Sequence, residues 1–104
     1  MSKVIYITGG SKGIGFGIAE VLLKNGHKVA ISGRNQDDVD KAVLELKKVS
    51  ESIFGFTSDV RNYEDEESAV SKILEKFLKL DVVIANAGLG IFKPVDELTI
   101  EDWN

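Results

Sequence analysis

The chain alternates between two hydrophobic patterns, one typical of strands and one typical of helices. Short runs rich in apolar and β-branched residues predict strands at 3–7, 28–32, 52–57 and 81–85. Between these runs, apolar residues recur at helical spacing and predict helices over 13–25, 35–46 and 64–78. Gly26 follows the first of these helices directly and is predicted to end it.

This order of elements predicts an α/β fold. Strands that are joined through helices are parallel, and right-handed crossovers then give a Rossmann-like doubly wound sheet. We expect one domain over residues 1–104, with four strands in the order 3-2-1-4 as part of a larger sheet. Ligands bind outside the carboxyl ends of strands where the strand order reverses, which here lies between the first and fourth strands.

A glycine-rich octet, Thr8-Gly9-Gly10-Ser11-Lys12-Gly13-Ile14-Gly15, joins the first strand to the first helix. Glycine allows a sharp turn and close approach of a phosphate, and the helix start offers N–H groups and a positive dipole end. A Gly-rich connecting loop is the alternative that the octet alone leaves open. The strand before it and the helix after it favour a nucleotide, although the spacing is G-x-x-x-G-x-G rather than G-x-G-x-x-G.

The octet resembles the cofactor motif of the short-chain dehydrogenase/reductase family. Asp59-Val60 resembles the adenine contact of that family, and Asn86-Ala87-Gly88 matches its N-A-G motif beside the cofactor cleft. The resemblance covers essentially the whole chain. The cofactor-binding residues that we predict are Gly9, Ser11, Lys12, Gly13, Ile14, Gly15, Arg34, Asn35, Asp59, Val60, Asn86, Ala87 and Gly88.

The end of the second strand indicates which dinucleotide is preferred. Sites for NAD usually hold a carboxylate there, whereas this chain has Ser32-Gly33-Arg34-Asn35. Arg34 offers a planar fork of donors to a 2′-phosphate, and Lys12 adds a second positive charge. We therefore predict that NADP(H) is preferred, with NAD(H) as the alternative. Two solvated surface cations are the other interpretation of these residues.

The resemblance implies an oxidoreductase that interconverts a small carbonyl and an alcohol by hydride transfer. The family uses a Tyr-x-x-x-Lys pair, but Tyr6 and Tyr63 are followed at the fourth position by Gly10 and Glu67. We assign no catalytic residue, and we expect the amino-terminal half of an enzyme, inactive alone. A non-catalytic nucleotide-binding module and an assembly fragment are the alternatives.

Composition limits the partners of the chain. A net charge of −4 argues against nucleic acid, and the absence of cysteine excludes a Cys-ligated metal site. No apolar run approaches the roughly 20 residues of a membrane span. The residues before the first strand leave no room for a signal peptide, so we expect a cytoplasmic location without membrane or metal binding.

Four smaller expectations concern packing. The acidic run Glu64–Glu67 is expected to be a solvated first helical turn rather than a metal site. Phe54 and Phe56 have period-two spacing and should pack on one side of the third strand, while Phe16 should fill core. The outer edge of the fourth strand is expected to be unpaired, which predicts a homo-oligomer.

Overall fold

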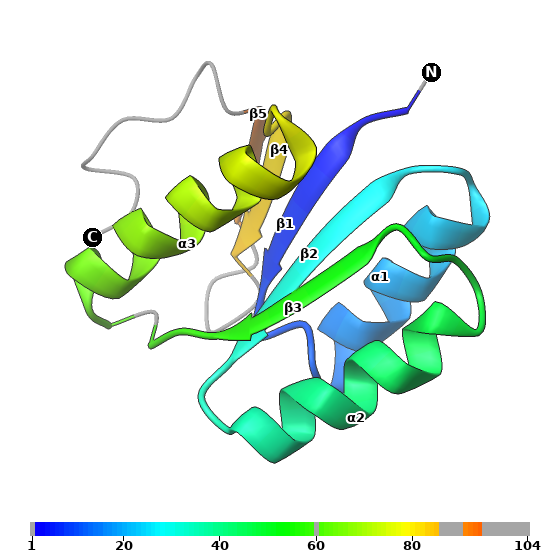
Figure 1. Ribbon diagram of the computed structural model, residues 1–104, viewed down its shortest axis with the longest axis horizontal. Helices are drawn as coiled ribbons and strands as arrows, with labels where there is room; N and C mark the ends of the chain where they lie inside the picture. The colour runs from blue at the N-terminus through cyan, green and yellow to red at the C-terminus, as the bar shows by residue number, and fades with distance from the viewer. Residues whose placement is uncertain (1, 60, 86–90, 95–104) are drawn as a thin grey trace.

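The computed structural model describes residues 2–59, 61–85 and 91–94, in which three helices pack on a five-stranded sheet (Figure 1). All seven sequence-predicted elements are confirmed, close to their predicted bounds. In chain order the elements are β1 (Val4–Thr8), α1 (Gly13–Lys24), β2 (Lys28–Gly33), α2 (Gln36–Lys47), β3 (Ile53–Thr57), α3 (Tyr63–Phe77), β4 (Val82–Ala85) and β5 (Ile91–Pro94).

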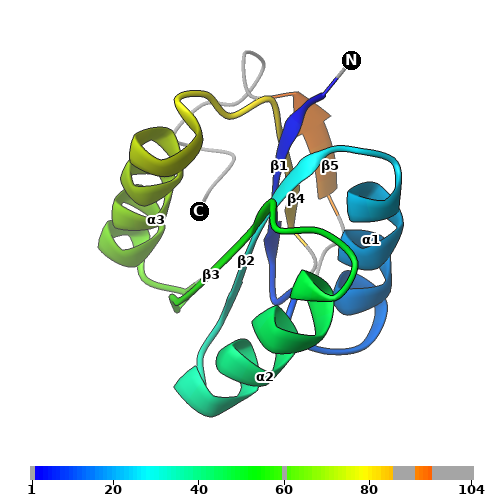
Figure 2. The same cartoon turned by 45° about the vertical axis from the view of Figure 1, so that its right-hand side comes forward.

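The sheet has the strand order β3-β2-β1-β4-β5. β1 pairs in parallel with both β2 and β4, and β2 pairs in parallel with β3, so the predicted order 3-2-1-4 is confirmed. The helices α1 and α2 cover one face of the sheet and α3 covers the other, as Figures 1 and 2 show. This is the doubly wound arrangement, and it brings the carboxyl ends of β1, β2 and β3 to one edge.

β5 corrects the expectation for the outer edge of β4. It pairs antiparallel with β4, in a register that runs from Val82 opposite Pro94 to Ala85 opposite Ile91. The prediction that this edge is unpaired is therefore wrong. β5 could not be predicted from the sequence, because a run of four residues is too short to show a strand period.

Each face of the sheet carries its own apolar cluster, because side chains alternate along every strand. Ile5, Ile7 and Ile31 pack beneath α1 and α2, while Val4 and Tyr6 belong to the cluster beneath α3. The predicted packing of Phe54 and Phe56 on one side of β3 is confirmed, since both lie on the α3 side with ring centroids 5.3 Å apart.

α1 contacts the sheet through small residues as well as apolar ones, and two of its apolar residues point away from it. Gly15, Ala19 and Leu23 are its buried residues, whereas Ile14 is 78% exposed. Phe16 is partly buried against the core, as expected. Of the apolar residues that predict the helix, Ile18 and Leu22 pack against the core, whereas Ile14 and Val21 are exposed.

Two glycines shape the helices, one by allowing close packing on the sheet and one by ending a helix. A Cβ at Gly55 of β3 would lie 2.4 Å from Val43 Cγ2, so glycine is what allows α2 to pack there. Gly26 has a φ of +84°, which glycine adopts without strain, and it ends α1 as predicted.

Candidate functional site

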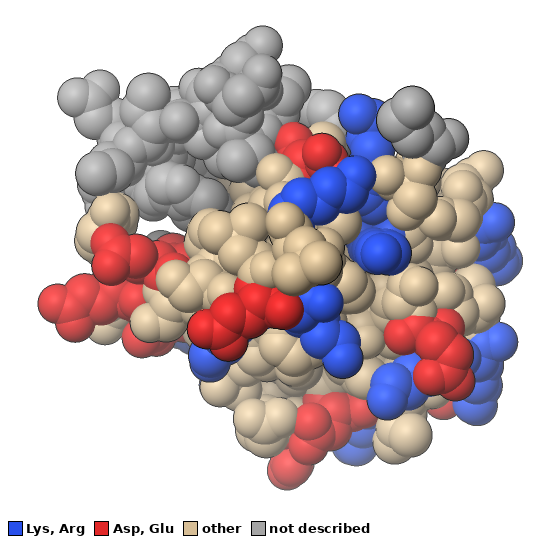
Figure 3. Space-filling view, turned by 45° about the horizontal axis from the view of Figure 1, so that its top comes forward, with Lys and Arg blue, Asp and Glu red and all other residues tan. Residues whose placement is uncertain are grey.

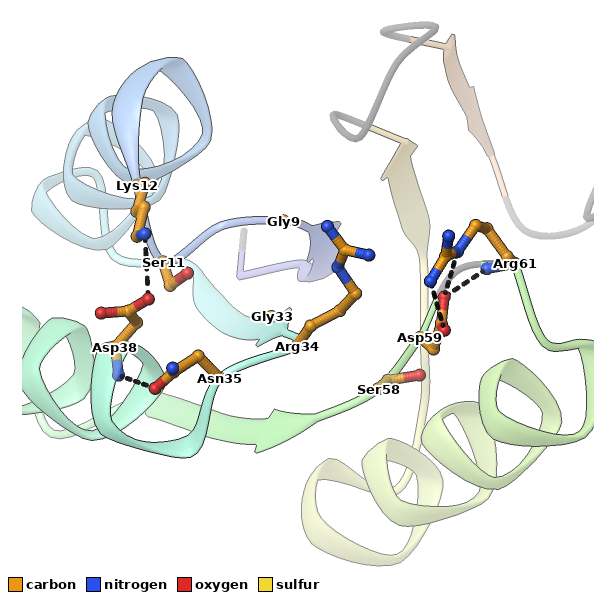
Figure 4. A pocket seen from close by; sticks show the side chains of 10 residues that line it. All are labelled: Gly9, Ser11, Lys12, Gly33, Arg34, Asn35, Asp38, Ser58, Asp59 and Arg61. Carbon is orange, nitrogen blue, oxygen red and sulfur yellow. Dashed lines mark hydrogen bonds and ion pairs between the residues drawn. The ribbon is translucent and has the colours of Figure 1, made fainter.

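A cavity of about 650 Å³ opens at the carboxyl ends of β1, β2 and β3 (Figure 4). This is the edge of the sheet at which doubly wound folds bind their ligands. Side chains and backbone from the glycine-rich turn and from the segments after β2 and β3 form its walls. The lining residues are Gly9, Ser11, Lys12, Gly33, Arg34, Asn35, Asp38, Ser58, Asp59 and Arg61.

The glycine-rich turn has backbone angles that explain its composition. Gly9 and Gly13 have φ values of +67° and +58°, in the left-handed region that other residues adopt only with strain. The turn also passes close to β2, because a Cβ at Gly33 would lie 2.8 Å from Ser11 Oγ. Glycines at these positions therefore hold Ser11 and Lys12 at the mouth of the cavity.

The start of α1 is unusual because nothing in its own sequence neutralises it. Lys12 is the N-cap residue, it makes no capping hydrogen bond through its side chain, and the first turn contains no acidic residue. The positive end of the helix dipole beside the cavity is therefore not compensated by a carboxylate of the helix. Such an end favours an anion.

The cations of the cavity differ in their partners. Lys12 Nζ lies 2.9 Å from Asp38 Oδ2, an ion pair between α2 and the glycine-rich turn. Asp38 belongs to the first turn of α2, where its N–H donates to Asn35 Oδ1 at 3.2 Å. Arg34 is exposed, and Figure 4 shows its guanidinium extending between Gly9 and the segment that follows β3. Within the part of the chain that the structure describes, Arg34 has no ion-pair partner within 4.0 Å.

Asp59 is held by Arg61 on the opposite wall. The guanidinium donates from Nε and Nη2 to the two carboxylate oxygens, each at 3.1 Å, and the Arg61 N–H donates to Oδ1 at 2.9 Å. These hydrogen bonds from Arg61 lower the pKa of Asp59. The Asp59 N–H donates to Asp65 Oδ2 at 3.1 Å, so the residue is ionised and fixed at both backbone and side chain.

A buried carboxylate lies behind this wall and corrects one expectation. Glu66, within the acidic run that was expected to be solvated, is only 3% exposed. It shares the sheet-facing side of α3 with Ala69 and Ile73, because positions three and seven residues apart lie on one helical face. The interpretation of the run as a solvated turn is wrong at this position, and burial raises the pKa of Glu66.

Glu66 is satisfied by two hydroxyl groups. Tyr6 donates its O–H to Glu66 Oε2 at 2.9 Å, and Ser58 donates to Oε1 at 3.1 Å. The Tyr6 oxygen also lies 2.9 Å from Ser32 Oγ. Burial raises the pKa of Tyr6 far above its usual value, and the negative charge of Glu66 adds to this effect. Tyr6 is therefore a neutral structural side chain.

The structure brings some of the predicted site residues together at the cavity and does not describe others. The first turn of α1 contains Gly13, Ile14 and Gly15, which are next to the cavity wall but do not line it. Val60, Asn86, Ala87 and Gly88 lie outside the described residues. The predicted residues that line the cavity are Gly9, Ser11, Lys12, Arg34, Asn35 and Asp59.

Four lining residues were missed by the sequence interpretation. Gly33 and Ser58 stand at the carboxyl ends of β2 and β3, so their place in the chain order was the signal. Asp38 lies at the cavity through an ion pair with Lys12, 26 positions earlier in the chain, which local spacing does not encode. Arg61 follows Asp59 by two positions and pairs with it, so its place beside a predicted residue was the signal.

The described residues offer no membrane-spanning helix and no metal-binding cluster beside this cavity. None of the helices there is long and apolar enough to cross a membrane, and no group of three or more His, Cys, Asp or Glu side chains is arranged to hold a metal ion. On the face shown in Figure 3, Lys and Arg side chains are intermixed with Asp and Glu side chains.

Known proteins are similar to this chain in both sequence and fold. Hydroxynaphthalene reductase of Aspergillus fumigatus is 34% identical over 98% of this chain and 38% of its own length. The alcohol dehydrogenase of the archaeon Thermococcus sibiricus, solved in complex with 5-hydroxy-NADP, is 41% identical with a TM-score of 0.78 over 97% of this chain and 43% of its own.

A variant of actinorhodin polyketide ketoreductase solved with NADPH is 32% identical, with a TM-score of 0.80, over 96% of this chain and 38% of its own. The chain thus spans less than half the length of these similar proteins. The family model for short chain dehydrogenases matches residues 3–104. A family match of this extent, together with the doubly wound fold, shows that the chain belongs to the short-chain dehydrogenase family of oxidoreductases.

Proposed function

We propose that this chain is the NADP(H)-binding part of an oxidoreductase that interconverts a carbonyl and an alcohol by hydride transfer. The observation that carries the proposal is the charge of the cavity. Its lining contains the cations Lys12, Arg34 and Arg61 against the carboxylates Asp38 and Asp59, which leaves one net positive charge. No carboxylate stands at the end of β2, where one would repel a 2′-phosphate.

The residues present fit such a dinucleotide. The glycine-rich turn and the uncapped start of α1 suit the pyrophosphate, and Arg34 with Lys12 suits the 2′-phosphate. Asp59, next to Val60, would accept from the adenine, and Asn86-Ala87-Gly88 would line the cleft. When bound, the nicotinamide supplies or takes up the hydride. Two similar proteins were solved with 5-hydroxy-NADP and with NADPH, which supports the proposal.

We propose that these 104 residues have no hydride-transfer activity of their own. Tyr6 is fully buried and hydrogen-bonded to Glu66, so it cannot reach a substrate, and neither Tyr6 nor Tyr63 is part of a Tyr-x-x-x-Lys pair. Incubation with NADPH and a panel of aldehydes and ketones should leave the nicotinamide absorbance unchanged. Turnover that is abolished by Tyr6→Phe or Tyr63→Phe would contradict this assignment.

A cytoplasmic location and a homo-oligomer are further parts of the proposal. Exposed apolar side chains on the helices, among them Val21, Leu44 and Leu74, support association. Light scattering over a dilution series should show a mass above that of the 11.4 kDa monomer at high concentration.

Calorimetric titration with NADPH and NADH tests the cofactor preference. We expect NADPH to bind about ten to one hundred times more tightly, because a charge-assisted phosphate contact contributes about 1.5–3 kcal/mol. Arg34→Ala should remove most of this preference. Lys41→Ala, a change of an exposed cation of α2 that does not line the cavity, should leave it intact. Equal affinities in the parent chain, or a preference that survives Arg34→Ala, would contradict the proposal.

A further inference from the structure

The carboxylate of Glu66 occupies a position at which α3 otherwise presents apolar side chains to the sheet. Ala69 and Ile73, its neighbours on that face, are buried in the cluster beneath α3. Burying a carboxylate is unfavourable unless hydrogen bonds replace its water. The chain meets this condition with the hydroxyls of Tyr6 and Ser58, and no buried side-chain polar atom of the described residues lacks a partner.

The Glu66 network joins three strands to one helix. Tyr6 lies on β1 and Ser32 on β2, while Ser58 directly follows β3. Each oxygen of Glu66 accepts from a different one of these segments, at 2.9 Å from Tyr6 and 3.1 Å from Ser58. The bonds therefore fix the end of β3 relative to the centre of the sheet rather than only to its own neighbours.

The network ends at the wall of the cavity. Ser58 is a lining residue, its hydroxyl is turned to Glu66, and its N–H donates to the Gly33 carbonyl at 3.0 Å. Asp59 follows at once, and Figure 4 shows Ser58 and Asp59 together on the wall opposite Lys12. Asp59 is also held by Arg61 and Asp65, and Ser58 connects it along the backbone to the Glu66 network.

We propose that Glu66 is a positioning residue for cofactor binding, which acts through Ser58 to hold Asp59 on the cavity wall before the cofactor arrives. The inference rests on the proposed function. A wall that is already ordered loses less conformational freedom when a ligand binds. The hydrogen bond between Glu66 and Ser58 should therefore strengthen the binding of the cofactor. Glu66 itself does not touch the cofactor, since Ser58 and Asp59 lie between it and the cavity.

Hydrogen bonding rather than charge is the property required of this side chain. An amide at position 66 accepts from Ser58 through its oxygen and donates through its nitrogen to the Tyr6 oxygen. Tyr6 then donates to Ser32 Oγ, a direction that the 2.9 Å contact between the two hydroxyls permits. Leucine has a similar size but holds neither hydroxyl.

The experiment compares NADPH affinity and thermal stability for five chains: the parent, Glu66→Leu, Glu66→Gln, Ser58→Ala and the control Glu67→Leu at the exposed neighbouring position. We expect Glu66→Leu and Ser58→Ala to weaken NADPH binding about tenfold, the effect of one hydrogen bond to a charged group. Glu66→Gln should bind within about twofold of the parent, since it keeps the bond to Ser58. Glu67→Leu should bind as the parent does.

Stability distinguishes positioning from general support of the fold. Glu66→Leu removes the acceptor of two buried hydroxyls, so we expect it to lower the melting temperature. A positioning role predicts in addition that its NADPH affinity is about tenfold weaker at temperatures well below its melting temperature, where the variant is folded. If Glu66→Leu does not fold, the NADPH affinity of Ser58→Ala alone tests the inference. Parent-like affinity in Glu66→Leu or Ser58→Ala would overturn the inference and leave the proposed function intact. A parent that binds neither NADPH nor NADH would overturn both.

Discussion

The starts of α1 and α3 differ in how their unpaired N–H groups and positive dipole ends are compensated. At α3, the side chain of Asn62 accepts from the Asp65 N–H at 3.2 Å, and acidic residues fill the first turn. At α1, Lys12 provides no side-chain cap and the first turn has no acid. A capping residue stabilises a helix by about 1 kcal/mol, and a carboxylate near the dipole adds about 0.3–1 kcal/mol.

The difference between the helix starts indicates where in this fold a ligand can bind. α2 resembles α3, since Asn35 caps it and Asp37 and Asp38 stand in its first turn. Two helices thus have a side-chain cap and acidic residues at their starts, while the helix beside the glycine-rich turn has neither, as expected if an anion binds there. The cavity lies against this uncapped start, which is why we read the contrast as functional.

Supplying α1 with the missing negative charge should have the largest effect. In Ser11→Asp a carboxylate takes the place proposed for a phosphate, and repulsion should weaken NADPH binding by at least about one hundredfold. Calorimetry measures the loss. The control is Ser11→Asn, which has nearly the same size without the charge, because Ser11 lies close to Gly33. Equal binding by the two variants would show that no anion is bound there.

Replacing the N-cap residues of α3 and α1 with alanine should destabilise the protein to different degrees. Asn62→Ala should lower the free energy of unfolding by about 1 kcal/mol, because the Asp65 N–H loses its acceptor. Lys12→Ala should change it by less than about 0.5 kcal/mol, since Lys12 forms an exposed ion pair and no cap. Urea denaturation of both variants checks this. A larger loss in Lys12→Ala would mean that α1 depends on this residue after all.

Releasing Lys12 from Asp38 should have the smallest effect. Asp38→Asn removes the carboxylate that lies 2.9 Å from Lys12 Nζ, so the cation is free to meet a phosphate. We expect NADPH binding to strengthen by about two- to fivefold at low salt and less at high salt, because exposed charges are screened. Asp37→Asn, in the same helical turn, is the control. If Asp38→Asn and Asp37→Asn strengthen NADPH binding equally, the effect comes from the change in net charge and not from the release of Lys12.

Most of the fold could be predicted because it is encoded locally. Each strand from β1 to β4 is a short apolar run, and each helix between them repeats its apolar residues at helical spacing. The handedness of crossovers then leaves few strand orders to consider. The turn at Gly9–Lys12 and Arg34 could be placed at one edge for the same reason, since both follow strands that are parallel.

What the sequence did not reveal depends on contacts between distant segments. β5 exists through its pairing with β4, and its four residues carry no period of their own. The helical spacing of Glu66 with Ala69 and Ile73 predicts that it faces the sheet. The carboxylate can be buried there only because hydroxyls of β1 and of the segment after β3 donate hydrogen bonds to it. The ion pair between Lys12 and Asp38 depends in the same way on how α2 meets the turn.

The central place of β1 has a consequence for the order of folding. Near its start, β1 is joined to the β2 side by Lys3 and His27, 24 positions apart, and to the β4 side by Val4 and Asp81, 77 positions apart. Closing the longer loop costs about 1 kcal/mol more chain entropy. We therefore expect β1, β2 and β3 to assemble before β4 docks. Because the cavity is built from the ends of those three strands, we expect its walls to form in the early-folding part of the chain, before β4 docks.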